Sequence, residues 1–166
     1  MLKKIHSKDL RYNLENWIKE LLSKPNPIFN NLPACPYAKQ AWAENKVEVN
    51  AFDNWVDTYN CLITTEYKFN EKDVYIFAFP KEDLTSYQLT SILDRLTKSW
   101  QRDWIVVLED HPDEIEQVQN FNLNFGDQCL LLVQSRNKLN KARTELEAKG
   151  YYKNWDPAYK KAVQYR

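Results

Sequence analysis

Apolar residues recur three and four positions apart in several stretches of the chain, a spacing that places them on one face of a helix. Helices are predicted in this way over residues 7–24, 37–45, 54–69, 84–100 and 136–149. Thr85 and Gln88 form a capping box at the start of the fourth helix. Ser135 is placed as the N-cap of the fifth, and Gly150 follows it where glycine commonly ends a helix.

A different pattern marks the strands. The segment KVEVNAF, residues 46–52, alternates polar and apolar side chains and predicts a half-exposed strand. Three apolar runs without alternation are typical of strands covered on both faces. These runs are VYIFAF, WIVVL and CLLLV, at 74–79, 104–108 and 129–133. Helices interspersed with such strands predict one α/β domain over residues 1–166, a sandwich of about four partly parallel strands with an extra N-terminal helix.

The charged residues are unevenly distributed, although the 23 basic and 23 acidic residues cancel. Residues 103–127 hold seven acidic residues and no Lys or Arg, whereas residues 134–166 hold nine basic against three acidic, a net of +6. Two solvated faces account for this pattern. The alternative is a basic surface for RNA or an acidic protein, to which Tyr152 and Trp155 contribute their rings. We expect the aromatic and basic tail, 151–166, to dock on the domain.

Composition excludes several classes of protein. Gly126 and Gly150 are the only glycines, so a P-loop, a dinucleotide-binding fingerprint and a nucleophile elbow are all excluded. No apolar run is long enough to span a bilayer, and the N-terminus lacks the apolar region of a secretory signal. The three cysteines lack a CxxC spacing, which indicates free thiols in a cytoplasmic protein. No particular cofactor follows from these features.

Cys35 is the first candidate for chemistry. It lies between two prolines in NLPACPYAKQAW, residues 31–42, just before a predicted helix. The positive end of that helix and the nearby Lys39 would lower the pKa of the thiol and favour a nucleophilic or redox-active cysteine. The alternative is a small buried residue in a turn. The neighbours expected to form a binding surface around it are Pro36, Tyr37 and Trp42.

His111 is the second candidate, because WIVVLEDHPDE places it just past a buried strand. The carboxyl ends of strands in open α/β sheets are where ligands bind. In one interpretation His111 is a base for the Cys35 thiol and is oriented by Asp113 or Glu109.

Two other interpretations of the same segment remain. The carboxylates between Glu109 and Asp113 could bind a divalent cation together with His111. Alternatively, Pro112 is the first residue of a helix that runs to about residue 119, with acidic residues in its first turn.

The stretch CPYAKQAWAENKVEVNAFD resembles the segment of glutaredoxins that runs from their CPYC active site through a helix into a strand. The order of helices and strands that follows is similar to that of the thioredoxin superfamily, which implies a thioredoxin-like core. Ala38 occupies the position of the second cysteine, so a dithiol mechanism is not available. No proline stands just before the strand at 104, where that superfamily has a cis-proline opposite the active cysteine. The resemblance therefore does not imply glutathione recognition of the family's kind.

A second resemblance is to an uncharacterised bacterial family, a domain of unknown function. Its LNLCPFAK segment, VRFVV-type strand and later HPD correspond here to LPACPYAK, KVEVNA and LEDHPD. The resemblance marks Cys35 and His111 but implies no activity.

These observations leave two main classes of function. The first is a cysteine-dependent enzyme, in which the Cys35 thiolate attacks a disulfide or an electrophilic carbon of a small molecule or protein while His111 assists. The second is a non-catalytic module that binds protein or RNA through the tail, with Tyr152 and Trp155 in the contact surface. No membrane partner is expected.

Overall fold

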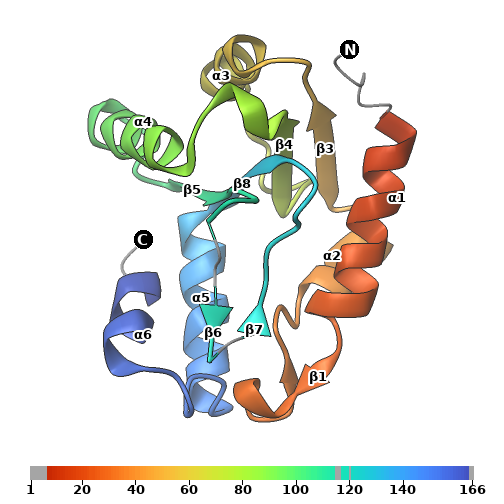
Figure 1. Ribbon diagram of the computed structural model, residues 1–166. Coiled ribbons are helices and arrows are strands. Elements are labelled where there is room, and N and C mark those ends of the chain that lie inside the picture. The colour runs from red at the N-terminus through yellow and green to blue at the C-terminus, as the bar shows by residue number, and fades with distance from the viewer. Residues whose placement is uncertain (1–6, 115–116, 120, 165–166) are drawn as a thin grey trace.

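A computed structural model describes residues 7–114, 117–119 and 121–164 (Figure 1). The helices are α1 (Ser7–Trp17), α2 (Ala38–Ala43), α3 (Trp55–Thr64), α4 (Ser86–Ser99), α5 (Arg136–Ala148) and α6 (Pro157–Gln164). The strands are β1 (Pro25–Asn26), β2 (Leu32–Pro33), β3 (Val47–Ala51), β4 (Val74–Phe79), β5 (Ile105–Asp110), β6 (Gln117–Val118), β7 (Phe121–Asn122) and β8 (Cys129–Ser135). The helix α1 continues as a π-helical turn over Ile18–Leu22. Two 3-10 turns span Pro27–Phe29 and Lys81–Asp83.

The main sheet has the order β3-β4-β8-β5. β3 and β4 are parallel, and β8 runs antiparallel to both of its neighbours. The carboxyl ends of β3, β4 and β5 therefore lie at the same end of the sheet, beside the start of β8. The predictions of an α/β fold with about four partly parallel strands are confirmed. β4 spans the predicted residues, and β5 and β8 each end two residues later than predicted.

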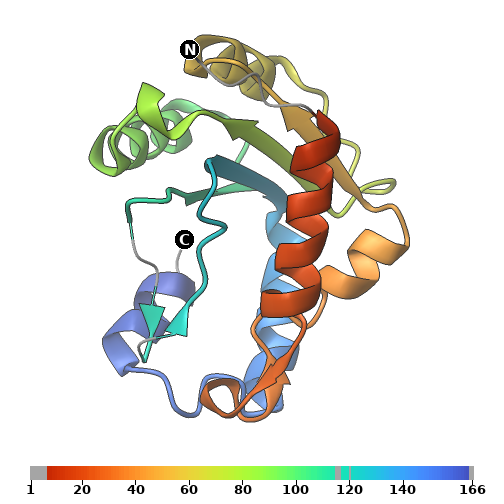
Figure 2. The same ribbon diagram turned by 45° about the vertical axis from the view of Figure 1, so that its right-hand side comes forward.

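Helices cover both faces of this sheet, α3 and α4 on one and α1 on the other (Figures 1 and 2). Strand alternation explains the division, because Phe77, Leu131 and Val133 pack in the core under α3 and α4. Ile76, Ala78 and Leu130 face the other way and pack with Leu10 and Leu14 of α1. Both faces of the central strands are thus buried, as their continuous apolar runs predict.

A third cluster of buried side chains lies below the sheet and holds the tail. Phe29 is 0% exposed and stacks on Tyr151, with ring centroids 5.2 Å apart. Tyr152 and Trp155 pack in the same cluster, which also includes Val118 and Phe121 of the β6–β7 hairpin. Aromatic side chains from three distant parts of the chain therefore build a second core around Phe29.

Capping residues in the sequence correctly predicted where several helices begin or end. The capping box of Thr85 and Gln88 is present, and the Ser135 hydroxyl accepts a hydrogen bond from the Lys138 amide. Gly150 has a φ of 74°, the left-handed conformation expected of a residue that ends a helix. The helix predicted over 54–69 is too long, since it ends at Thr64 and the next residue has extended backbone.

The helix predicted from Pro112 to about residue 119 is wrong where the structure describes that segment. Residues 112–114 form a turn, and Gln117–Val118 is a strand that pairs with Phe121–Asn122. In this turn the Glu114 amide donates to the His111 carbonyl and the Asp113 amide donates to the His111 ring. None of the helices in the described part of the chain combines the length and apolar character that a membrane span requires.

Candidate functional site

Cys35 is held in a bend between β2 and α2. Its amide donates to the carbonyl of Leu22 at 2.9 Å, and its carbonyl accepts from the Ala38 amide at 3.2 Å. The preceding residue is fixed as well, because the Tyr151 hydroxyl donates to the Ala34 carbonyl. The backbone around this thiol is therefore tied both to the end of the first helical segment and to the tail.

The pKa of Cys35 is shifted in the direction opposite to the predicted one. Burial raises it, and this effect outweighs the hydrogen bonds from the Ala38 and Tyr37 amides, which lower it. The helix α2 begins three residues after the cysteine and has only six residues, so its dipole is weak. Lys39 is exposed on that helix. The thiol form is thus favoured over the thiolate.

Cys35 should consequently react slowly with iodoacetamide in the native protein. We expect alkylation at pH 7.5 to be at least about tenfold slower than in urea, because only the thiolate reacts and the cysteine is half-buried. The rate should still be rising above pH 9. Peptide mapping by mass spectrometry gives the rate at Cys35 separately from those of Cys61 and Cys129. Fast labelling at neutral pH that levels off below pH 8 would instead restore the predicted nucleophile.

The neighbours of Cys35 take part in contacts of their own. The Tyr37 hydroxyl donates to the Glu145 carboxylate of α5 at 2.8 Å, and burial together with this bond raises the pKa of Tyr37 to about 12. The guanidinium of Arg11 lies over the Trp42 ring at 5.2 Å. Pro36 is half-buried next to Cys35. These side chains attach the cysteine segment to α1 and α5.

His111 is buried at the end of β5, with 2% of its surface exposed. Its Nε2 lies 2.8 Å from the Leu84 carbonyl, and its Nδ1 accepts from the Asp113 amide at 3.1 Å. A carbonyl can only accept, so Nε2 carries the proton and Nδ1 does not. Both ring nitrogens are therefore engaged by the backbone of the chain itself.

The acidic neighbours of His111 point in different directions. Glu109 lies beside Thr90 of α4, with 3.5 Å between their oxygens. Asp113 forms an ion pair with Lys81 at 3.5 Å, and an Asp110 oxygen accepts from the Phe125 amide. Within residues 7–114, 117–119 and 121–164, no three His, Cys, Asp or Glu side chains are grouped so that they could hold a metal ion. The predicted cation site at Glu109–Asp113 is not formed there.

Cys35 and His111 belong to different parts of the molecule. The contacts of Cys35 are with Leu22, Tyr37 and Ala38, whereas those of His111 are with the loops that follow β4 and β5. Among the residues that the structure describes, no hydrogen bond or ion pair joins the two. The cysteine-dependent enzyme stays a prediction, without the histidine partner expected for it.

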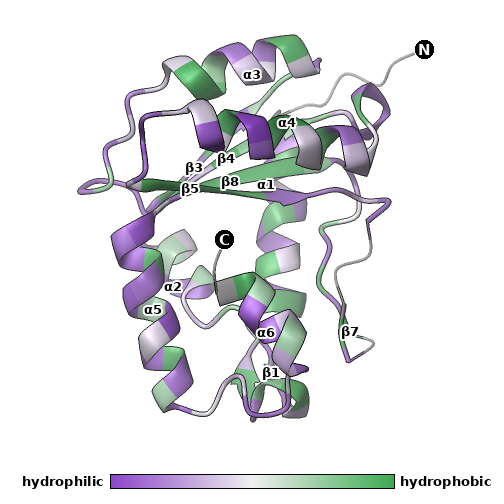
Figure 3. Cartoon of the chain, turned by 90° about the vertical axis from the view of Figure 1, so that its left-hand side faces the viewer, coloured by the Kyte–Doolittle hydropathy of each residue, from purple (hydrophilic) through white to green (hydrophobic). Residues whose placement is uncertain are grey.

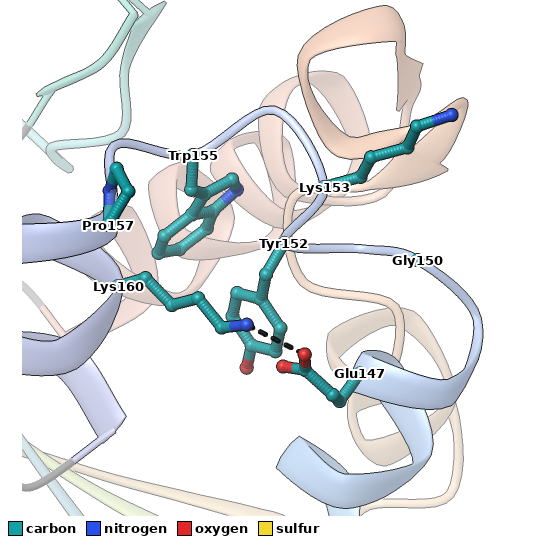
Figure 4. Close-up of a pocket in the computed structure, with 7 residues that line it drawn as sticks. All are labelled: Glu147, Gly150, Tyr152, Lys153, Trp155, Pro157 and Lys160. Atoms are coloured by element: carbon teal, nitrogen blue, oxygen red, sulfur yellow. Dashed lines mark hydrogen bonds and ion pairs between the residues drawn. The ribbon is translucent and has the colours of Figure 1, made fainter.

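A pocket of about 390 Å³ lies between the end of α5 and the start of α6. The residues that line it are Glu147, Gly150, Tyr152, Lys153, Trp155, Pro157 and Lys160 (Figure 4). In the view of Figure 4, Lys160 extends below Trp155. It forms an ion pair with Glu147 at 2.6 Å, and its ammonium group lies 5.7 Å from the centre of the Tyr152 ring. The indole N–H of Trp155 is buried and has no hydrogen-bond partner in the described part of the chain.

The surface around this pocket carries more exposed lysines than exposed carboxylates, which include Glu147 and Asp156. Lys141, Lys149, Lys153 and Lys161 are exposed on α5, on α6 or between them. No carboxylate among the described residues forms an ion pair with any of the four. We call these lysines and the pocket the α5–α6 face.

Sequence reasoning identified Tyr152 and Trp155 but not the other residues of the pocket. Glu147 and Lys160 are 13 positions apart and meet only because the chain reverses at Gly150. The net charge of the segment was the signal that pointed to this region. Tyr152 is 6% exposed, so the base-stacking surface expected of its ring is largely buried.

Comparisons with known proteins add no further assignment. No family model, no curated protein and no solved structure matches the chain. The resemblances to glutaredoxins and to the uncharacterised bacterial family therefore stay predictions.

Proposed function

We propose that the chain is a non-catalytic binding module that holds an acidic segment of a partner protein on the α5–α6 face. The observation that carries this proposal is the pocket of about 390 Å³ lined by Lys153, which forms no ion pair with the described residues and lies in the chain close to the exposed Lys149 and Lys161. Its volume is within the range of ligand pockets and can hold one large side chain as an anchor.

Two properties of the pocket favour an acidic protein segment over RNA. Single-stranded RNA binds by stacking its bases on free aromatic faces, whereas Trp155 already contacts Tyr151, Tyr152 and Tyr159 at centroid distances of 4.9–5.5 Å. The second property is burial, because Tyr152 is only 6% exposed and its ring therefore offers no face on which a base could stack.

Charge reversal on this face should abolish most of the binding. The probe is a fluorescein-labelled peptide with a phenylalanine between two pairs of glutamates, measured by anisotropy at about 50 mM salt, where surface charges are weakly screened. Lys149→Glu with Lys153→Glu should weaken binding at least about tenfold, since two attractive charges become repulsive. Lys98→Glu, an exposed lysine on α4, is the matched control and should change affinity less than about twofold.

The outcome distinguishes this proposal from its alternatives. Equal binding by the doubly reversed variant would place the contact elsewhere on the surface. Tighter binding of a uridine octamer than of the peptide would assign the face to nucleic acid. Binding of neither probe would contradict the proposed function, provided that circular dichroism shows the wild-type protein to be folded.

A further inference from the structure

The strand β5 forms one edge of the main sheet and pairs only with β8 in the four-stranded order. Figure 3 views the molecule from this side, with β5 at the front and no described helix or strand drawn across it. An uncovered edge strand offers main-chain donors and acceptors to another strand. The edge of β5 is therefore a second surface on which the chain could bind a partner.

The pairing of β5 with β8 establishes which main-chain groups of β5 face outward. The Arg136 amide donates to the Trp104 carbonyl. The main-chain amides and carbonyls of Trp104 and of every second residue after it therefore face β8. The main-chain amides and carbonyls of Ile105, Val107 and Glu109 consequently face away from β8, at the free edge of the sheet. The Ile105 groups are occupied, since its amide donates to the Arg102 carbonyl and its own carbonyl accepts from Arg136. No such bond joins the amides or carbonyls of Val107 and Glu109 to other described residues.

β5 is only partly protected as an edge, because its charged residues Glu109 and Asp110 lie at its carboxyl end and the Arg136 guanidinium occupies the Ile105 carbonyl alone. The strand IVVLED contains neither lysine nor proline, the residues that commonly block edge-to-edge pairing. At the opposite edge, β3 lies beside α1 (Figure 1). The difference singles out β5 as the edge that is open to pairing.

The surroundings of β5 indicate which kind of segment would fit. In Figures 1 and 2, α4 and α6 both extend further out than β5 on the side of its free edge. A second copy of the four-stranded sheet would meet these helices, whereas a single extended peptide could lie between them. A slender segment is therefore a better occupant than a second copy of the domain.

Charge at the carboxyl end of β5 adds a chemical preference. Burial and the carboxylates Asp110, Asp113, Glu82 and Asp83 raise the pKa of the neighbouring Cys129 to about 12. Glu109 lies on the edge itself, and residues 103–127 include no Lys or Arg. Lysine or arginine side chains opposite Glu109 would form favourable cross-strand pairs.

We propose that β5 binds an extended basic segment of a partner protein as an added strand, through the main-chain groups of Val107 and Glu109. This contact is separate from the α5–α6 face, which is proposed to bind an acidic segment. The chain would then connect two partners of opposite charge. Strand addition of this kind takes its affinity from main-chain hydrogen bonds and its specificity from alternate side chains.

The test uses an acetylated and amidated peptide of seven residues in which lysine and valine alternate. In native-state hydrogen exchange, a saturating amount of peptide should slow the amides of Val107 and Glu109 by at least about tenfold. The amides of Val106 and Leu108 point toward β8 and serve as internal controls with unchanged exchange. The same peptide with methylated amides on the pairing side should not bind, because it lacks the donors that an added strand needs.

Variants of the edge complete the experiment. Val107→Pro removes an outward amide, which an edge strand tolerates, and should abolish peptide binding, whereas Val107→Thr keeps the amide and should bind. Unchanged exchange at Val107 and Glu109, or equal binding of the methylated peptide, would overturn the proposal even if Val107→Pro fails to fold. Equal binding of a glutamate–valine peptide would refute the basic preference. A dimer in sedimentation without peptide would assign the edge to a second copy.

Discussion

Replacing Phe29 with alanine is expected to lower the free energy of unfolding by about 3–5 kcal/mol, the range for a large aromatic side chain lost from a core. Phe29 is 0% exposed and contacts the rings of Tyr151, Phe121 and Trp155. Through these rings Phe29 connects the Pro27–Phe29 turn, the β6–β7 hairpin and the tail. Its loss would leave a cavity at the point where these three segments meet.

The same substitution should alter the function proposed for the α5–α6 face. Trp155 and Tyr152 line the pocket and pack in the cluster around Phe29, so binding of the acidic peptide should weaken. Cys35 should be alkylated faster, because Tyr151 holds the Ala34 carbonyl next to it. Urea unfolding followed by circular dichroism gives the stability, and peptide mapping gives the labelling rate.

Phe29→Leu is the matched control, since it keeps most of the apolar volume and should cost less than about 1.5 kcal/mol. The described cluster would be refuted as a second core if the alanine variant lost less than about 1 kcal/mol. It would also be refuted if Cys35 in that variant were labelled at the wild-type rate.

Features of the fold that depend on neighbouring residues could be predicted from the sequence. The apolar run VYIFAF marked both ends of β4, because a strand buried on both faces needs apolar side chains at every position. Thr85 and Ser135 marked the starts of α4 and α5, because a cap bonds to amides only three residues away. These signals do not depend on tertiary contacts.

The segment after β5 shows why such signals can fail. Pro112, Asp113 and Glu114 are all favourable in the first turn of a helix. In the folded chain the His111 ring and carbonyl accept from the amides of Asp113 and Glu114 and close a turn instead. Val118 then packs in the cluster around Phe29. A tertiary contact thus overrode the local preference, and no sequence pattern within the segment announced it.

The candidate site depended even more on distant contacts. The environment of Cys35 was judged from its prolines and from the helix after it, but its surroundings include Tyr151, whose hydroxyl reaches a carbonyl 117 positions away. Burial by such residues reversed the predicted direction of the pKa shift. The pocket was indicated only by the charge and aromatic content of the tail, because its residues converge through a chain reversal.

Removing the imidazole of His111 is expected to destabilise the protein by roughly 2–4 kcal/mol, the combined effect of two interrupted hydrogen bonds at a buried site. His111→Phe keeps a ring of similar size but leaves the Leu84 carbonyl and the Asp113 amide without their partner. Urea unfolding measures the loss. Hydrogen exchange at the Asp113 amide should become faster in the same variant, because the acceptor at Nδ1 is gone.

His111→Gln is the matched control, because its side-chain amide can still donate to the Leu84 carbonyl in place of Nε2. It should recover about half of the lost stability. This pattern is expected only if the ring is a structural link between the loops after β4 and β5, where its two nitrogens bond to backbone. A histidine held for chemistry at an open surface would tolerate both changes within about 0.5 kcal/mol. Equal stabilities of His111→Phe and the wild type would therefore return His111 to the list of candidate catalytic residues.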